Sequence, residues 1–258
     1  MIRVAVAGAL GRMGTEVIRA VSSVGDMQPV AGIDVKAGVE SQGVPVSADL
    51  RQAVAQLKPD VLVDFTVAEA AFANAMTALE LGVRPVIGTT GMSAEQTAQI
   101  QARARETRTG AFIAPNFAIG AVLMMHFARL GSHYFDSAEI IELHHDQKID
   151  APSGTAVKMA QDMAEAHAKA FASNVPEKET LPGGRGAEWQ GLRLHSVRLP
   201  GLVAHHEVIF GAQGQTLTLR HDSTDRTSFM PGVLIAVREV LKLDRLVIGL
   251  DNLLGLTT

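Results

Sequence analysis

The sequence of 258 residues contains no cysteine, and this absence excludes several kinds of protein at once. Without thiols there is no disulfide framework, no thiol nucleophile, no zinc–cysteine site and no iron–sulfur cluster. Aromatic residues are also scarce, at 4%, with one Trp and one Tyr. The core must therefore be aliphatic, as is typical of parallel sheets that helices cover on both faces.

A positive charge excess and a long apolar run are missing too. Lys and Arg number 23 against 27 Asp and Glu, a net charge of −4, so nucleic acid is not expected as a partner. No run reaches the roughly 18 apolar residues that span a bilayer. The apolar stretch Val4–Leu10 is too short and too rich in glycine for a secretory signal. These absences predict a cytoplasmic protein without a membrane partner.

The first half of the chain repeats one pattern, in which runs rich in Val and Ile alternate with Ala-rich segments of helical period. This alternation predicts crossover connections and a parallel sheet, the doubly wound α/β class. The expected strand–helix pairs are Ile2–Ala7 with Arg12–Ser22, Val30–Ile33 with Ala48–Leu57, Val61–Phe65 with Ala68–Leu81, Val83–Ile87 with Ala94–Glu106, and Ala111–Ala114 with Ala121–Leu130.

From Asp136 onward the pattern changes to strand-like segments around one helix. Only turns separate the last three of these strands, so we expect them to pair antiparallel. The stretch Ala172–Gln190 is expected to be a mobile loop or flap, and the tail Leu246–Leu250 is expected to return to the first sheet. The expected strands are Ala138–His144, Leu192–Arg198, Val203–Gly211 and Thr216–His221, and the expected helices are Thr155–Ala170 and Met230–Leu241.

A glycine-rich turn joins the first expected strand to the first helix. Its G-x-x-G-x-x-G spacing lets backbone N–H groups near Gly11 approach a pyrophosphate, although a tight turn without a ligand has the same composition. Asp34 ends the second strand, about 20 residues on, where a carboxylate can accept hydrogen bonds from ribose hydroxyls. The turn consists of Gly8, Ala9, Leu10, Gly11, Arg12, Met13 and Gly14.

Two cations leave the choice of dinucleotide open. Arg12 or Lys36 can reach a 2′-phosphate and offset repulsion from Asp34, and Lys36 is equally compatible with a solvated surface charge. NADH and NADPH are both candidates.

Two further turns follow the fourth and fifth expected strands, where an open parallel sheet presents loops to its ligand. Small residues there let a flat ring approach the backbone, so we expect contacts with nicotinamide and ribose. The alternative is that the first turn only caps the next helix. The residues are Gly88, Thr89, Thr90 and Gly91 in one turn and Ala114, Pro115, Asn116 and Phe117 in the other.

The densest group of ionisable side chains lies between Glu142 and Ala156. Ser153, Gly154 and Thr155 open a helix there, and their N–H groups and hydroxyls suit a substrate carboxylate. Lys148 can supply a countercharge or, if desolvated, a proton.

Adjacent residues His144 and His145 point to opposite faces if they lie on a strand. Each of them, taken singly, is also compatible with an ordinary polar residue at a sheet edge. A second cluster, His205-His206-Glu207, raises the question of a metal. Neither cluster has an i, i+4 ligand pair, so no metal site is expected and we interpret the second as sheet residues.

These motifs together resemble the 4-hydroxy-tetrahydrodipicolinate reductases, also called dihydrodipicolinate reductases. The resemblance runs over essentially the whole chain. It rests on Val6–Gly14, Asp64–Thr66, Gly88–Gly91, Ala114–Gly120 and Glu142–Ala156.

The resemblance implies an NAD(P)H-dependent reduction of 4-hydroxy-tetrahydrodipicolinate to tetrahydrodipicolinate, with loss of water, in lysine and diaminopimelate biosynthesis. It implies a Rossmann nucleotide-binding domain at residues 1–117 and 227–258. It also implies an inserted α/β domain at residues 118–226 that binds the substrate and builds a homotetramer. Family members often carry a basic residue directly after the acidic one of the second strand, where this chain has Val35.

The family's site residues carry over by position. His144 would donate or accept a proton and Lys148 would donate one, while His145, Ser153, Gly154 and Thr155 would bind the substrate. The cofactor contacts would fall on Gly8, Ala9, Leu10, Gly11, Arg12, Met13, Asp34, Gly88, Thr89, Thr90, Ala114, Pro115, Asn116 and Phe117.

Two other functions are alternatives to this one. A dehydrogenase of the same plan that acts on a semialdehyde or a sugar would have less use for a carboxylate site at a helix N-terminus. A dinucleotide-responsive regulator without turnover would not need His144 and Lys148 together.

Overall fold

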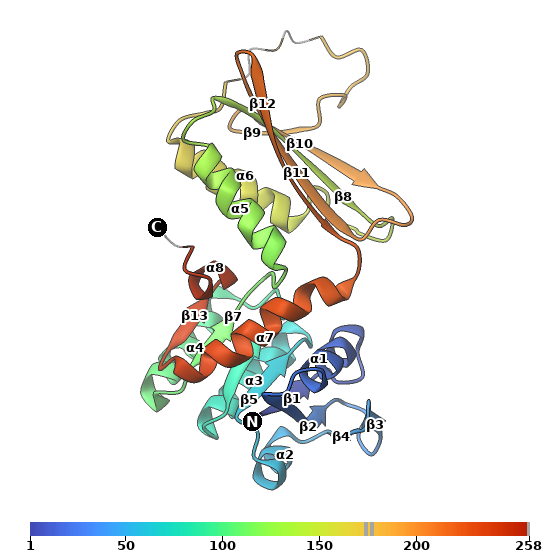
Figure 1. The fold of residues 1–258 in the computed structure, drawn as a ribbon, viewed down its shortest axis with the longest axis vertical. Coiled ribbons are helices and arrows are strands. Elements are labelled where there is room, and N and C mark those ends of the chain that lie inside the picture. The colour runs from blue at the N-terminus through green and yellow to red at the C-terminus, as the bar shows by residue number, and fades with distance from the viewer. Residues whose placement is uncertain (173–174, 176–177, 257–258) are drawn as a thin grey trace. The chain divides into compact units, whose positions relative to one another are not determined.

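The computed structural model describes residues 1–172, 175 and 178–256, and the chain divides into two compact units. The first unit joins Met1–Ile119 to Arg226–Thr258, and the second is Gly120–Asp225. The N-terminal (blue) and C-terminal (red) segments of the chain therefore both lie in the first unit (Figure 1). The expected domain boundaries, 117/118 and 226/227, lie within two residues of these divisions.

The sheet of the first unit has the strand order β13-β7-β6-β5-β1-β2-β4-β3. Its neighbours pair in parallel except β3 and β4. The order reverses at β1, since β2 lies on one side of it and β5 on the other. The strands are β1 Ile2–Ala7, β2 Met27–Ile33, β3 Glu40–Ser41, β4 Val44–Ser47, β5 Val61–Asp64, β6 Arg84–Ile87, β7 Ala111–Ile113 and β13 Leu246–Ile248.

Helices cover both faces of this sheet. Right-handed crossovers that proceed in opposite directions from β1 place their helices on opposite faces. Accordingly α2, α3 and α4 share apolar clusters with the sheet, whereas α1 contacts α7 (Figure 1). The helices are α1 Arg12–Ser22, α2 Leu50–Leu57, α3 Ala68–Glu80, α4 Ala94–Thr107, α7 Met230–Glu239 and α8 Leu250–Leu253, with short 3₁₀ turns at Arg226–Phe229 and Val240–Lys242.

The predicted doubly wound Rossmann class is confirmed, including the return of the tail as β13 beside β7. The short strands β3 and β4 were not expected from the sequence. Pro45 lies within β4, and proline lowers the strand signal of a segment because it has no N–H to donate.

The second unit packs two helices on one face of a five-stranded sheet of order β12-β11-β8-β10-β9. Central strand β8 alternates strictly, with Ala138 and Ile140 buried among helix side chains and their sequence neighbours half-buried on the other face. The elements are α5 Ile119–Gly131, β8 Ser137–His144, α6 Gly154–His167, β9 Ala187–Trp189, β10 Leu192–Arg198, β11 Ala204–Ala212 and β12 Gln215–Ser223.

One expectation about this sheet was partly wrong. Strands β11 and β12 pair antiparallel as expected, but β10 pairs in parallel with β8 instead of with β11. The connection at residues 199–203 crosses the end of β8, where the Leu199 N–H donates to the His144 carbonyl at 3.1 Å. Five residues reach about 16 Å, more than two strand spacings of roughly 4.8 Å, so a short connection can skip one strand.

The expected flap Ala172–Gln190 contains β9, which pairs with β10. Residues 173–174 and 176–177 of that stretch lie outside the described residues, so the flap stays a prediction.

Candidate active site

The glycine turn after β1 leaves backbone open for a ligand. Gly8 has a φ of +75°, and a Cβ on Gly14 would lie 2.1 Å from the Gly8 carbonyl oxygen, so only glycine fits there. The N-cap position of α1 is Gly11, which has no side chain to cap the helix. The N–H groups of its first turn therefore suit the pyrophosphate of a dinucleotide.

This turn lies where the strand order reverses, between β1 and β5. The Phe65 N–H donates to the Ala7 carbonyl at 3.3 Å, which holds the loop after β5 against the turn. Ligands of open α/β sheets bind outside the carboxyl ends of the strands at such a reversal. The topology thus marks the same place as the glycine spacing.

Asp34 points toward the glycine turn. Its Oδ2 accepts a hydrogen bond from the Leu10 N–H at 3.1 Å, which fixes the carboxylate at the C-terminal end of β2. Val35, the next residue, is 93% exposed, and Arg12 is exposed on the turn itself. The Asp34 carboxylate thus lies beside the glycine turn, where the sequence predicts a ribose contact.

The loops after β6 and β7 are tied down by polar side chains that the sequence reasoning did not assign. Buried Asp64 accepts hydrogen bonds from Thr89 Oγ1 at 3.1 Å, Thr66 Oγ1 at 2.6 Å and Asn74 Nδ2 at 2.8 Å. Gly88 lies so close to Phe65 that a Cβ would be 2.1 Å from its ring. The side chain of Thr89 is therefore committed to the protein, and a ligand contact there would use the backbone.

The loop after β7 is likewise held by packing and by a side-chain hydrogen bond. The Phe117 side chain is buried, with its ring centroid 5.7 Å from that of Phe65 and 5.9 Å from that of Phe112. Asn116 Oδ1 accepts from the Ala118 N–H at 2.9 Å, just before α5 begins. These residues, with Ala114 also buried, present backbone rather than side chains.

In the second unit, a buried carboxylate organises the His–Lys segment. Glu142 is completely buried on β8, and its two oxygens accept from both terminal nitrogens of Arg198 at 2.7 and 2.9 Å. His144, two residues on and therefore on the same face, places Nδ1 2.5 Å from Glu142 Oε2. Burial would raise the pKa of Glu142, but hydrogen bonds from His144, Arg198 and Ser196 outweigh it and hold that pKa well below its ordinary value.

A second histidine packs against the first. The rings of His144 and His206 meet edge to face, with centroids 5.3 Å apart, and His206 Nε2 lies 3.2 Å from Ser153 Oγ. Burial lowers the pKa of His206 to about 4; His144 adds to this effect and Glu142 opposes it. His206 is thus neutral near pH 7.

Lys148 lies in the turn before α6 and contacts a carboxylate there. Its Nζ is 2.7 Å from Asp150 Oδ1, and this ammonium, with help from the Gly154 N–H, lowers the pKa of Asp150. The resemblance assigns Lys148 as a proton donor and Gly154 as a substrate contact. The contact shows that a carboxylate fits between Lys148 and the start of α6.

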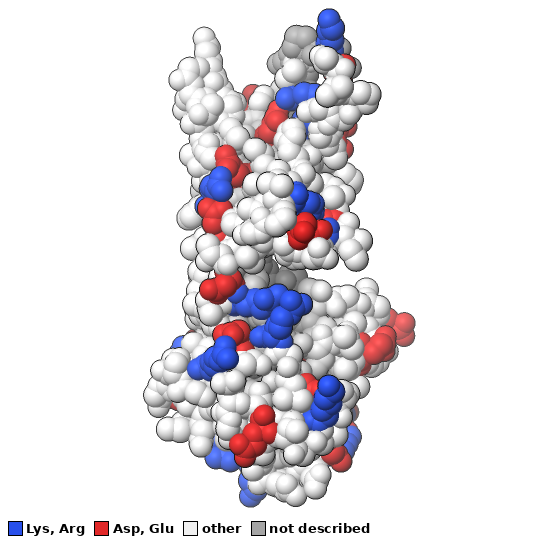
Figure 2. Space-filling view, turned by 90° about the vertical axis from the view of Figure 1, so that its right-hand side faces the viewer, with Lys and Arg blue, Asp and Glu red and all other residues white. Residues whose placement is uncertain are grey.

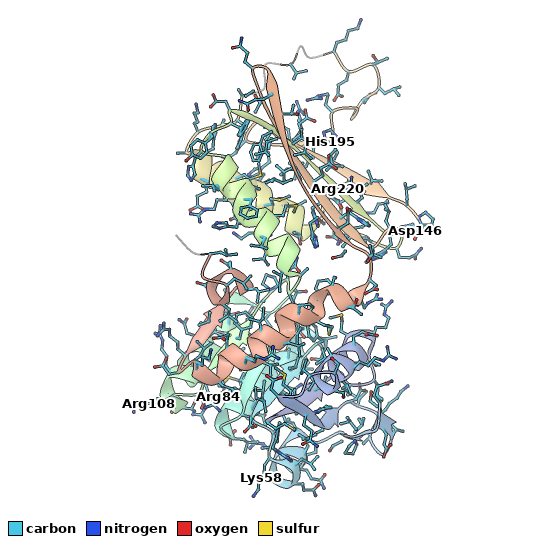
Figure 3. The ribbon with its side chains drawn as sticks, viewed as in Figure 1. Lys58, Arg84, Arg108, Asp146, His195 and Arg220 are labelled. Carbon is cyan, nitrogen blue, oxygen red and sulfur yellow. The ribbon has the colours of Figure 1, made fainter. Side chains whose placement is uncertain are left out.

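The other expected substrate residues differ in how available they are. His144 is the buried last residue of β8, and His145 is exposed just beyond the strand, so the expectation for two residues on one strand does not apply. Thr155 is partly exposed at the start of α6. Ser153 is buried, and its N–H donates to Glu142 at 3.2 Å while its Oγ accepts from the Ala156 N–H. Asp146 lies in the exposed turn after β8 (Figure 3).

The sequence reasoning assigned no role to Glu142 or to Arg198. The two-residue spacing of Glu142 and His144 on a strand could have placed them on one face. No sequence signal joined Arg198 to them, because its place opposite His144 depends on the parallel β8–β10 pairing.

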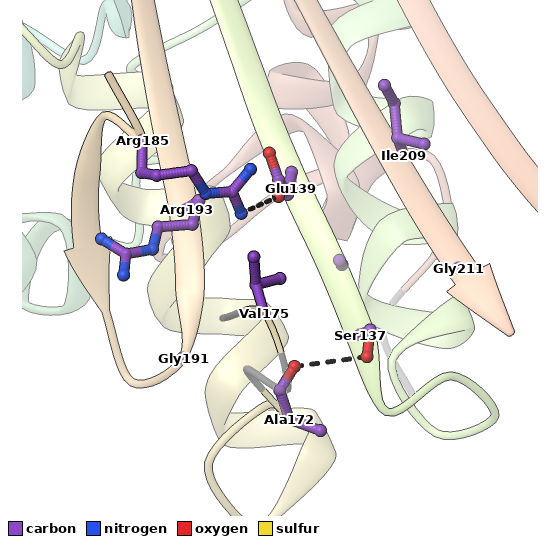
Figure 4. A pocket seen from close by; sticks show the side chains of 10 residues that line it. Ser137, Glu139, Ala172, Val175, Arg185, Gly191, Arg193, Ile209 and Gly211 are labelled. Atoms are coloured by element: carbon purple, nitrogen blue, oxygen red, sulfur yellow. Dashed lines mark hydrogen bonds and ion pairs between the residues drawn. The ribbon is translucent and has the colours of Figure 1, made fainter. Parts of the chain in front are cut away.

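A pocket of about 380 Å³ lies elsewhere, on the sheet face opposite Glu142. Glu139, Arg185 and Arg193 line it, and Arg185 pairs with Glu139 at 2.5 Å (Figure 4). Glu139 and Glu142 are three residues apart on β8 and so face opposite sides. This pocket is distinct from the His144 cluster.

The surface carries both signs of charge, and Figure 2 shows Lys and Arg beside Asp and Glu on the face it presents. Among the described residues, no three His, Asp or Glu side chains are arranged to hold a metal ion. Every helix in the described ranges is too short or too polar to cross a bilayer.

Comparisons with known proteins agree over both units. Family models match residues 2–117 as "Dihydrodipicolinate reductase, N-terminus" and residues 120–254 as "Dihydrodipicolinate reductase, C-terminus". The 4-hydroxy-tetrahydrodipicolinate reductase of Listeria monocytogenes serotype 4b is 51% identical over 98% of this chain and 100% of its own. That of Moorella thermoacetica is 51% identical over 98% of each chain.

A solved structure is similar over nearly its whole length. It is the dipicolinate-bound dihydrodipicolinate reductase of Paenisporosarcina sp. TG-14, with a TM-score of 0.91, 47% identity and coverage of 98% of this chain and 99% of that one. Together with the geometry of the two units, these matches show that the chain belongs to the dihydrodipicolinate reductase family.

Proposed function

We propose how the residues of this chain carry out the reaction of its family. The chain is an NAD(P)H-dependent oxidoreductase that reduces 4-hydroxy-tetrahydrodipicolinate to tetrahydrodipicolinate, with loss of water, in lysine and diaminopimelate biosynthesis. The observation that carries the division of roles is that buried Glu142 holds His144 Nδ1 and the Ser153 N–H before α6, while Lys148 contacts Asp150 in the adjoining turn.

The first unit binds the dinucleotide through the turn from Gly8 to Met13, with Asp34 on the adenosine ribose. The loops at Gly88–Thr90 and Ala114–Phe117 contact the nicotinamide half through their backbones. When bound, the nicotinamide supplies a hydride from C4 to the substrate ring. Both NADH and NADPH are accepted, since Arg12 offsets the charge of Asp34, and Asp34 adds ribose contacts that favour NADH.

The second unit binds the dicarboxylate substrate. One carboxylate takes the place of the Asp150 carboxylate, between Lys148 Nζ and the backbone N–H groups of Gly154 and Thr155. His145, exposed beside this turn, binds the substrate as well. The dipicolinate in the Paenisporosarcina structure is a diacid of the same kind.

Proton transfer falls to His144 and Lys148. Negative charge develops toward the ring nitrogen during reduction, and the Lys148 ammonium stabilises it and donates a proton. With Nδ1 of His144 against Glu142, Nε2 is the nitrogen that exchanges a proton with the substrate.

We also propose that the chain forms a homotetramer in the cytoplasm. The sheet face opposite α5 and α6 exposes part of Ile141, Leu143, Val197 and Ile209, which would be covered by other copies. Light scattering on the purified protein should give four times the chain mass, and a monomer would contradict this assembly.

The roles of His144 and Lys148 are tested by initial rates with freshly generated substrate, as loss of nicotinamide absorbance. His144→Ala should lower kcat about 10²–10⁴-fold with a smaller effect on KM. Lys148→Ala should lower kcat and raise KM for the dicarboxylate together, because the ammonium acts in binding and in the transition state.

The matched controls are His133→Ala and Lys158→Ala, two exposed residues of the same types in the same unit. Every variant must first show native thermal unfolding and unchanged NADH affinity. Near-normal kcat in the His144 variant, or unchanged affinity and kcat in the Lys148 variant, would refute the assigned roles.

A further inference from the structure

The buried carboxylate of Glu142 accepts hydrogen bonds on both of its oxygens. It is completely buried, and its two oxygens accept from Arg198 Nη1 and Nη2, His144 Nδ1 and the Ser153 N–H. These donors come from β10, from β8 itself and from the start of α6. One carboxylate therefore connects three elements at the point where the expected catalytic residues emerge.

Arg198 extends this connection to the turn before α6 that carries Lys148. Its Nη2 also donates to the Asp150 carbonyl at 2.6 Å, and its Nη1 to the Val197 carbonyl at 2.7 Å. The Asp150 side chain in turn holds Lys148. Arg198 thus links Glu142, which holds His144, to the turn that carries Lys148.

Stability alone is a weak reason for such a pair. A buried ion pair can usually be replaced by well-packed apolar residues at little or no loss of folding free energy, because both charges must leave water. An apolar pair, however, could neither accept the Nδ1–H of His144 nor hold the Asp150 carbonyl. The specific hydrogen bonds, rather than the burial, distinguish this pair.

We propose that Glu142 and Arg198 are positioning residues of the reductase. Glu142 accepts the Nδ1–H of His144, which fixes the ring orientation and the tautomer that leaves Nε2 for the substrate. Arg198 keeps the Glu142 carboxylate in place and sets the turn that presents Lys148. The inference rests on the proposed roles of His144 and Lys148 and adds the two side chains through which they are aligned.

Glu142→Gln is the sharpest test, because it keeps the shape and the carbonyl acceptor for Arg198 Nη2 but offers an amide N–H₂ where Oε2 accepts from His144 Nδ1 and Arg198 Nη1. We expect kcat to fall at least tenfold, and at most by the roughly 10⁴-fold that general acid–base catalysis supplies. KM for the dicarboxylate should change less than threefold, and NADH affinity should not change. Arg198→Ala should lower kcat and raise KM, whereas Arg198→Lys should restore part of the KM effect.

A spectroscopic readout separates positioning from mere folding. In the ¹⁵N-labelled protein, at a pH where the His144 ring is neutral, its Nδ1 should carry the proton, and in Glu142→Gln the proton should move to Nε2.

The control pair is Arg51 and Glu80, an exposed ion pair whose two hydrogen bonds measure 2.6 and 3.1 Å. Glu80→Gln and Arg51→Lys should leave kcat and KM unchanged.

Several results would overturn the inference. They are a folded Glu142→Gln enzyme with kcat within threefold of the starting protein, an Nε2–H tautomer in the starting protein, or an unchanged tautomer in the variant. Failure of the proposed function itself would look different, since the starting protein would then not oxidise NADH or NADPH with the substrate, while the ring-nitrogen signals would still report on Glu142.

Discussion

Replacing His206 by glutamine should remove a specific acid sensitivity of the second unit. His206 is 4% exposed, its Nε2 lies 3.2 Å from Ser153 Oγ, and its pKa is about 4 against an ordinary 6.5. A glutamine amide can reach the same hydroxyl and does not titrate. The variant therefore keeps the hydrogen bond and loses the proton-binding site.

The size of the effect follows from the two pKa values. Between about pH 6.5 and 4, the unfolded chain binds a proton at His206 that the folded chain does not, so the free energy of unfolding falls as the pH falls. Above about pH 6.5 this site does not lower the free energy of unfolding, and by about pH 4 the lowering is complete. At about 1.4 kcal/mol per pKa unit, the total is about 3 kcal/mol, which is large against a usual net stability of about 5–15 kcal/mol.

Urea unfolding at fixed ionic strength, from pH 4 to 7.5, measures this directly. The chain has one Trp, Trp189 in β9, so tryptophan fluorescence reports on the unit that holds His206. The other titratable groups are the same in both proteins, so the difference between the two proteins isolates His206. If both proteins lost the same free energy between pH 7 and 4, burial would not hold His206 neutral and the reasoning would be wrong.

Three further outcomes are expected from initial rates and thermal unfolding. Asp34→Ala should raise KM for NADH more than KM for NADPH, because the lost hydrogen bonds go to ribose hydroxyls; equal changes would count against that contact. Gly14→Ala should cost about 3 kcal/mol of stability, since its Cβ would be 2.1 Å from Gly8 O, whereas Gly25→Ala, with nothing within 4 Å, should be near neutral. Asp150→Asn should lower KM for the dicarboxylate severalfold by freeing Lys148 and Gly154, and an unchanged or raised KM would show that the side chain does not compete with substrate.

The elements of the first unit were predictable because their signals are local. Glycine spacing after β1, Asp34 at the end of β2 and the strand–helix alternation all act within a few residues or one βαβ unit. They led to the correct fold class, and the dinucleotide site at the carboxyl ends of the strands stays a prediction. The structure then showed why Thr89 and Phe117 offer backbone rather than side chains, which depends on packing that no local pattern encodes.

The second unit was harder for a physical reason. The partner of β10 is decided by which strand occupies the middle of the sheet, and β8 lies far from β10 in sequence. A turn between β10 and β11 favours a hairpin locally, yet β8 lies between them and pairs its two backbone edges with β10 and β11. Arg198 meets Glu142 only as a result of that choice, so the ion pair could not be read from either segment alone.

The first unit is assembled from the two ends of the chain, and this has a consequence during synthesis. Strand β7 is covered on its outer edge by β13, and Leu246 of β13 completes an apolar cluster with Ile100 and Ala111. A ribosome that adds about 5–20 residues per second needs on the order of ten seconds to go from β7 to β13. Throughout that interval the nascent sheet has an unpaired β7 edge, the kind of surface that chaperones protect, while the second unit can already fold.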